Sequence, residues 1–233
     1  MACLRRWVSP PAAGSLLLVA GCGPTPLSTL NPGTAQAAHV ATVWYAMAWG
    51  SLVIVLFMLA LVLVAVRARS GGSPAHARWL LLGGGVLFPA GVIAALLVYA
   101  HLSGPEVPEP QYHVQVTARQ WRWEAAYPDA PDRTKRSTNV IHIPAGIPTL
   151  IELRAVDVIH SFWVPRLGGK MDAIPGRVNR LVYTADQPGT YEGQCAEYCG
   201  AGHAAMRFQL IAHEPDDLEQ VLAALPTDQD QTP

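Results

Sequence analysis

The sequence predicts a membrane-anchored protein in which two bilayer-spanning helices are followed by an all-β domain. Two apolar segments, 40–66 and 79–102, contain no charged side chain. Only 14% of the 233 residues are charged, whereas about a quarter are charged in a typical soluble protein. All 17 acidic residues lie after Gly104, where short β-branched runs are separated by Pro and Gly turns. The two parts of the chain are therefore expected in different surroundings.

The N-terminus resembles a bacterial export signal. Arg5 and Arg6 precede the short apolar run "SLLLVAG", and small residues stop directly at a cysteine in "LVAGC". This pattern predicts a lipoprotein signal peptide at 1–21, with Cys22 as the lipidated first residue of the mature chain. Cleavage by ordinary signal peptidase near "AQA", without a lipid, is the alternative. Residues 22–39 are rich in Pro, Gly, Ser and Thr and are expected to form a flexible tether.

The two apolar segments are long enough to be transmembrane helices. Each exceeds the roughly 20 residues needed to cross about 30 Å of hydrocarbon. The loop between them, 67–78, holds Arg67, Arg69 and Arg78 and no acid. By the positive-inside rule this loop is cytoplasmic, so both the processed N-terminus and everything after the second helix lie outside the cytoplasm.

Residues 105–225 are expected to form one all-β domain. Runs such as "YHVQVTARQWRWEAAY" and "TLIELRAVDVIHSFWVP" alternate in polarity or are rich in β-branched and aromatic residues, which is typical of a β-sandwich or barrel. The stretch "EPDDLEQVLAALP" predicts a short terminal helix, and 226–233 are expected to be disordered. After Gly104 the chain has 11 Lys and Arg against 17 Asp and Glu, a net charge of −6.

The stretch "GQCAEYCGAGHAAM" concentrates residues that bind metals. It contains Cys195, Cys199, His203 and Met206 at spacings of four, four and three. Thioether and thiolate ligands favour copper, whereas a structural zinc site would use four Cys or His ligands and no Met. A disulfide between the two cysteines, with incidental His and Met neighbours, is the alternative. The composition of the stretch therefore predicts a copper site.

The number of sulfur ligands points to more than one copper. A mononuclear blue-copper site uses one Cys, two His and a weak Met, so this loop has one Cys too many. His160, in "VDVIHSFWVP", is the candidate for the second imidazole. Two thiolates, two imidazoles and a thioether match two coppers bridged by both sulfurs.

Together, "DVIHSFWVP", "QWRW" and "GQCAEYCGAGHAAM", placed after two membrane helices, resemble subunit II of haem–copper cytochrome c oxidases. The resemblance covers residues 40–225 and implies a cupredoxin-like Greek-key barrel that carries the dinuclear, mixed-valence CuA centre. It also implies that Cys195 and Cys199 bridge the two coppers. The remaining ligands would be His160 and Met206 on one copper, and His203 and the backbone carbonyl of Glu197 on the other.

The same resemblance assigns roles around the metal. The carboxylate of Glu197 would help bind an Mg²⁺ or Mn²⁺ ion shared with subunit I. Trp121 would be the point at which electrons arrive from cytochrome c, with a barrel-edge aromatic as the alternative, whereas Trp123 is expected in the core. Asp157 resembles an acid near the family's metal sites, and a plain surface acid is the alternative.

The resemblance implies a function and a set of partners. The chain would be subunit II of an aerobic terminal oxidase in the bacterial inner membrane, with its β-domain in the periplasm. It would accept electrons from a separate c-type cytochrome and pass them to haem in subunit I, which also holds CuB and reduces O₂ to water. Other oxidase subunits are expected as partners, and no nucleic acid.

Two features depart from the family pattern. Arg119 and Arg122 flank Trp121, although the −6 charge of this part suits a basic cytochrome, which leaves the donor open. The start of the second membrane segment, "RWLLLGGGVLFP", lacks the glutamate that many relatives carry there. The rival interpretations are a copper-free quinol-oxidase subunit II, a membrane-tethered copper carrier and the CuA domain of a nitrous or nitric oxide reductase.

Overall fold

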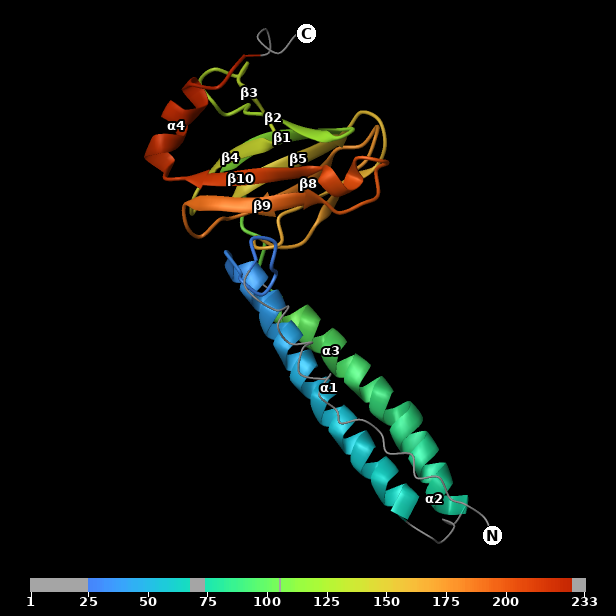
Figure 1. Cartoon of the computed structure of the whole chain (residues 1–233). Coiled ribbons are helices and arrows are strands. Elements are labelled where there is room, and N and C mark those ends of the chain that lie inside the picture. Colours follow the sequence, from blue (N-terminus) through green and yellow to red (C-terminus); the bar gives the residue numbers. More distant parts are fainter. Residues whose placement is uncertain (1–24, 68–73, 105, 228–233) are drawn as a thin grey trace, which may run out of the picture.

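The computed structural model describes residues 25–67, 74–104 and 106–227. The expected signal peptide and Cys22 lie outside these residues. Two antiparallel helices form a hairpin that projects from a β-domain (Figure 1). Within these described ranges, two helices are long and apolar enough to cross a membrane, Ala35–Arg67 and Ala77–Ser103, with mean hydropathies of 2.8 and 2.3. The predicted order of two apolar helices followed by a β-domain is confirmed.

The second helix of the hairpin changes its hydrogen-bond pattern along its length. Helix α2 spans Pro74–Trp79, a π-helical stretch spans Leu80–Leu87, and α3 spans Phe88–Ser103, following α1 at Ala35–Arg67. The Phe88 amide donates to the carbonyl of Gly83, five residues earlier. Three consecutive glycines and the following Pro89, which has no amide hydrogen, weaken the ordinary helical ladder here. The surrounding side chains are exposed, as expected for a face that meets lipid or another subunit.

The β-domain consists of two five-stranded sheets. One sheet has the order β3-β2-β1-β5-β8, and the other has the order β4-β10-β9-β6-β7. Strands far apart in sequence pair in parallel, β1 with β5 and β4 with β10, while the remaining pairs are antiparallel. The strands are β1 Tyr112–Arg119, β2 Arg122–Ala126, β3 Arg136–Thr138, β4 Val140–Pro144, β5 Thr149–Ala155, β6 His160–Trp163, β7 Met171–Ala173, β8 Asn179–Tyr183, β9 Gly189–Cys195 and β10 Arg207–His213, and the short helix α4 is Pro215–Ala223.

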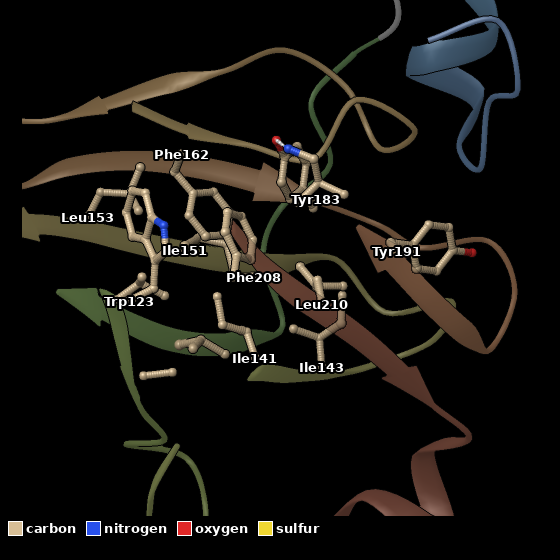
Figure 2. Close-up of a cluster of buried hydrophobic side chains, with 14 of the residues drawn as sticks. Trp123, Ile141, Ile143, Ile151, Leu153, Phe162, Tyr183, Tyr191, Phe208 and Leu210 are labelled. Carbon is tan, nitrogen blue, oxygen red and sulfur yellow. Dashed lines mark hydrogen bonds between the residues drawn. The ribbon is translucent and has the colours of Figure 1, made fainter. Parts of the chain in front are cut away.

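An aromatic cluster fills the core between the sheets (Figure 2). Trp123 is fully buried, as the sequence predicted, and its ring meets Phe162 edge-on at a centroid distance of 5.3 Å. Phe162 in turn stacks on Phe208 at 4.4 Å. The ring of His160 lies 6.0 Å from that of Trp123, so this cluster directly supports the first residue of β6. Large interlocking rings of this kind leave little freedom to the side chains they support.

The segment before α1 differs from the expected flexible tether. Residues 35–39 already belong to α1, and the residues before it bind the β-domain. The Gly33 amide donates to the carbonyl of Arg166 at 2.7 Å, and the Thr34 hydroxyl donates to the carbonyl of Leu167 at 3.0 Å. The Thr34 hydroxyl oxygen also accepts from the Ala37 amide at 2.9 Å, which is an N-cap bond. Composition suggested flexibility because it does not reveal these long-range backbone partners.

Gly193 offers a test of the core packing next to the loop that holds the cysteines. A Cβ added at Gly193 would overlap the ring of Phe208, which cannot retreat because it stacks on Phe162. We expect Gly193→Ala to destabilise the β-domain by about 1–3 kcal/mol through overpacking. Thermal unfolding of the detergent-solubilised chain, followed by circular dichroism, measures this effect. Gly169→Ala is the control, because nothing lies within 4 Å of an added Cβ there; equal melting temperatures for both variants would contradict the prediction.

Candidate metal centre

The candidate metal ligands meet at one end of the sheet formed by β6, β9 and β10. His160 is the first residue of β6, Cys195 is the last residue of β9, and Met206 directly precedes β10. The Cys195 amide donates to the carbonyl of Met206 at 2.9 Å, and the Ala196 amide donates to the carbonyl of Ser161 at 2.9 Å. These bonds fold the loop between β9 and β10 back across the end of β6. The strand ends therefore bring together residues that are up to 46 positions apart in sequence.

Two free thiols form the centre of the cluster. Cys195 and Cys199 are both buried, and their Sγ atoms lie 3.8 Å apart. A disulfide has a sulfur–sulfur distance of about 2.05 Å, so the two residues are not bonded to each other. Burial raises the pKa of the Cys199 thiol, and the neighbouring Cys195 raises it further. Because this environment disfavours free thiolates, a bound cation would be needed to hold both sulfurs in the deprotonated form.

The other predicted donors surround the sulfurs on both sides. His160 Nδ1 lies 3.9 Å from Cys195 Sγ, and His203 Nδ1 lies 3.7 Å from Cys199 Sγ. Met206 Sδ also lies 3.7 Å from Cys199 Sγ. Met206 and His160 are buried, whereas His203 is partly exposed. The soft and borderline donors expected from the motif are thus gathered around one pair of sulfurs.

The backbone carbonyl of Glu197 contacts the sulfur cluster, whereas the residue is exposed. Its carbonyl oxygen lies 3.2 Å from Cys195 Sγ, on the protein side of the loop. The residue itself is exposed. The backbone oxygen can therefore belong to the sulfur cluster while the carboxylate remains available to a group outside the chain.

Asp157 fixes the orientation of the His160 ring. His160 Nε2 lies 2.8 Å from an Asp157 carboxylate oxygen. The carboxylate also accepts from the backbone amides of Gln120 and Val158, each at 2.7 Å. Partial burial favours the neutral acid, but these hydrogen bonds together lower the pKa of the Asp157 carboxyl. An ionised Asp157 requires a proton on Nε2, which leaves the Nδ1 lone pair directed to the sulfurs, as in carboxylate–histidine–metal arrangements.

Trp121, in the turn between β1 and β2, packs against the loop that carries Cys199 and remains 43% exposed. Its indole Nε1 donates to the backbone carbonyl of Cys199 at 3.3 Å, and the Gln120 side chain donates to the same carbonyl at 2.7 Å. The ring rests on Gly202, where an added Cβ would come within 2.6 Å of the ring's Cγ. Gln120 and Gly202 were not singled out from the sequence. The sequence offered one hint for each: Gln120 directly precedes Trp121, and Gly202 lies in the glycine-rich stretch "GAGH".

Apolar side chains that lie close in sequence to His160 and Cys199 are exposed. Val158, Ile159 and Tyr198 are exposed, and Tyr198 is 76% accessible. Arg119 and Arg122 both pair with Glu124, at 3.4 and 2.7 Å, so the two positive charges beside Trp121 are partly offset. These pairs are exposed and contribute little to stability, but they lower the local positive charge that a basic partner would meet.

Comparisons with known proteins agree with this arrangement. Residues 129–212 match the family described as "Cytochrome C oxidase subunit II, periplasmic domain". A relative from Bacillus cereus, named quinol oxidase subunit 2, is 31% identical over 214 residues, which cover 85% of this chain and 72% of the relative. The chain belongs to the cytochrome c oxidase subunit II family. It is therefore subunit II of a haem–copper oxidase, and its β-domain has the expected cupredoxin-like fold.

Other matches cover about half of this subunit II. Cytochrome c oxidase subunit 2 of Alkalihalophilus pseudofirmus is 43% identical over 115 residues, which are 49% of this chain and 33% of the relative. The matched region thus spans about a third of that relative's length. The crystal structure of the periplasmic domain of subunit II from Bradyrhizobium japonicum is 29% identical, with a TM-score of 0.48, and covers 52% of this chain and 96% of that domain.

Proposed function

We propose that this subunit II binds a dinuclear copper (CuA) centre, accepts electrons from a c-type cytochrome and passes them to haem in subunit I. The observation that carries the proposal is the cluster of donors around two unbonded, buried thiols 3.8 Å apart. When bound, such a centre would supply a one-electron relay whose charge is shared over two metals and two sulfurs. Reduction of O₂ to water would take place in subunit I, so this chain alone would reduce none.

The distribution of donors over the two sulfurs fits two coppers better than one. His160 lies next to Cys195 and Met206 lies next to Cys199, so these two ligands together contact both bridging sulfurs. His203 approaches Cys199, while the Glu197 carbonyl approaches Cys195, so the second pair spans them as well. A single tetrahedral metal would leave two of these donors unused. The family resemblance assigns His160 and Met206 to one copper, and His203 and the Glu197 carbonyl to the other, and the distances are compatible with that pairing.

The residues around the cluster would restrict its rearrangement. Asp157 holds the His160 ring, and the aromatic cluster of Trp123, Phe162 and Phe208 supports the strand that carries it. The loop ligands are tied by the backbone bonds between Cys195 and Met206. Ligands fixed in this way move little when the metal changes charge, which favours fast electron transfer.

Trp121 is proposed as the point where electrons arrive. Its ring is partly exposed, and its indole Nε1 bonds to the carbonyl of a proposed copper ligand. Exposed apolar side chains next to the candidate ligands in sequence would allow a cytochrome to approach closely, while the −6 charge after Gly104 would attract a basic donor from a distance. The exposed Glu197 carboxylate is proposed to help bind an Mg²⁺ or Mn²⁺ ion at the contact with subunit I.

The proposal also includes the setting of the chain. The two candidate spans would place the hairpin in the bacterial inner membrane with the β-domain in the periplasm. Lipidation of Cys22 and removal of residues 1–21 remain part of this proposal. The predicted cytoplasmic loop, 67–78, would face the opposite side.

Metal analysis and electron paramagnetic resonance of the full chain test the copper centre. We expect two coppers per detergent-solubilised, copper-reconstituted chain and a spectrum in which one unpaired electron is shared by two copper nuclei. A single copper with an ordinary type 1 or type 2 spectrum, or a Cys195–Cys199 disulfide that binds none, would contradict the proposal. Because one relative is a quinol oxidase subunit, reduction of the assembled oxidase should be compared with a c-type cytochrome and with a quinol; reduction by quinol alone would assign the chain to that class.

A further inference from the structure

Two histidines outside the sulfur cluster lie side by side on the outer face of a sheet. His142 is in β4 and His213 ends β10, and these neighbouring strands run parallel. The register pairs His142 with Ile211 and His213 with Pro144, so both imidazoles leave the same face of the sheet. His142 Nδ1 lies 2.9 Å from His213 Nε2 and the ring centroids are 5.1 Å apart, so the two rings meet edge to edge through these nitrogens. The two strands thus direct one nitrogen of each ring toward the other.

This pair is separate from the candidate copper centre. His213 is seven residues beyond Met206 along β10. At about 3.3 Å per residue in a strand, the two sites are roughly 23 Å apart. The proposed electron-transfer function uses neither histidine, so that function does not explain why they are held together.

One histidine of the pair is buried and the other is partly exposed. His142 is 7% exposed, and its backbone amide donates to the hydroxyl of Tyr127 at 3.1 Å. Burial lowers the pKa of His142 to about 4, with a further lowering from His213, so this ring is neutral at neutral pH. His213 is only partly buried, and the exposed Asp217 on α4 is near enough for its charge to act on the ring. Neutral imidazoles are the form that binds transition metals.

We propose that His142 and His213 form a cross-strand binding site for a divalent transition-metal cation with tetragonal preference, such as Cu²⁺ or Ni²⁺. With metal–nitrogen bonds of about 2.0–2.1 Å, two nitrogens 2.9 Å apart subtend roughly 90° at the metal. Each imidazole would have to turn by roughly 45° on binding, because its nitrogen now points along the line to the other ring. That angle suits adjacent positions of a square-planar or tetragonal site. Tetrahedral Zn²⁺ would require the nitrogens to separate to about 3.3 Å. Water would fill the open positions.

A simple hydrogen bond between the two rings is the competing explanation of the 2.9 Å distance. In that case one ring donates and the other accepts, and the pair serves only to join β4 to β10. The two explanations differ in one measurable respect. A hydrogen-bonded pair without metal affinity takes up no cation, whereas a chelating pair gains a cation that bridges two strands and stabilises the folded domain.

The test uses the full chain with its candidate copper centre already loaded. Cu²⁺ is then titrated, and electron paramagnetic resonance records any added type 2 signal and its nitrogen splitting. We expect one further Cu²⁺ per chain with two equivalent nitrogen ligands. His213→Asn and His142→Asn should each weaken this binding by more than the roughly 10–100-fold that loss of an outer partner costs a metal site.

His113→Asn is the matched control, because His113 is also a histidine of the β-domain but is exposed and paired with Asp129. It should keep the added signal. If the buried His142→Asn variant fails to fold, the half-exposed His213→Asn variant decides the outcome. The absence of an added type 2 signal in the wild-type chain, or its persistence in His213→Asn, would overturn the proposal. Neither result would bear on the signal of the sulfur cluster, which is recorded before the titration.

Discussion

Cys199→Ser is expected to eliminate the dinuclear centre and, with it, electron transfer from a c-type cytochrome to haem. Cys199 Sγ lies within 3.8 Å of Cys195 Sγ, His203 Nδ1 and Met206 Sδ, so three of the proposed donors lie around it. A serine oxygen is a harder and less easily deprotonated ligand, and it cannot spread charge between two coppers. Copper content and the electron paramagnetic resonance spectrum of the purified variant measure the loss directly.

Tyr198→Phe is a suitable control for this substitution. Tyr198 precedes Cys199 in the same loop, is highly exposed and keeps its edge contact with the His203 ring when only the hydroxyl is removed. It should retain two coppers and their shared unpaired electron. If the serine variant also kept two equivalent coppers, the bridging role assigned to Cys199 would be wrong.

Trp121→Leu should slow reduction by cytochrome c by roughly tenfold or more, equivalent to about 1.4 kcal/mol in the barrier, and should leave the copper spectrum unchanged. The substitution removes the exposed ring and its bond to the Cys199 carbonyl but no proposed copper ligand. Gln120 continues to donate to the same carbonyl, which holds the loop in place. Stopped-flow reduction of the assembled oxidase, with copper content measured on the same sample, separates the two effects.

Trp121→Phe distinguishes the ring from its hydrogen bond. The phenyl ring can still rest on Gly202 but cannot donate to the Cys199 carbonyl. A rate near that of Trp121→Leu would show that the indole bond carries the effect, whereas a rate near that of the wild type would assign the effect to the aromatic face. Unchanged rates in both variants would remove Trp121 from the path of electrons.

The ligand cluster was predictable because its chemistry is concentrated in a short sequence. Cys195, Cys199, His203 and Met206 lie within 12 consecutive residues, and because this loop contains a single histidine, a second imidazole had to come from elsewhere, with His160 as the candidate. The two apolar helices were equally accessible from length and the absence of charge. In both cases the decisive property belongs to the residue types and their spacing.

Features that depend on distant backbone partners were not predictable in the same way. The bonds from Gln120 to Asp157 and to the Cys199 carbonyl join segments that are far apart in sequence. The binding of Gly33 and Thr34 to the β-domain uses carbonyls more than 130 residues away, which no local pattern encodes. The pairing of His142 with His213 likewise depends on the parallel register of β4 and β10.

The bond between Thr34, at the start of α1, and the β-domain would fix the height of the proposed copper centre above the bilayer. Thr34 caps α1 and also holds Leu167, which is seven residues beyond His160 on the same run of chain. The β-domain is therefore attached to the hairpin both by the chain after α3 and by the cap of α1. Two attachment points restrict swivelling in a way that one linker cannot. The tunnelling distance from the sulfurs to an acceptor within the membrane would then stay nearly constant during turnover, and the electron-transfer rate would not depend on a search for a docked orientation.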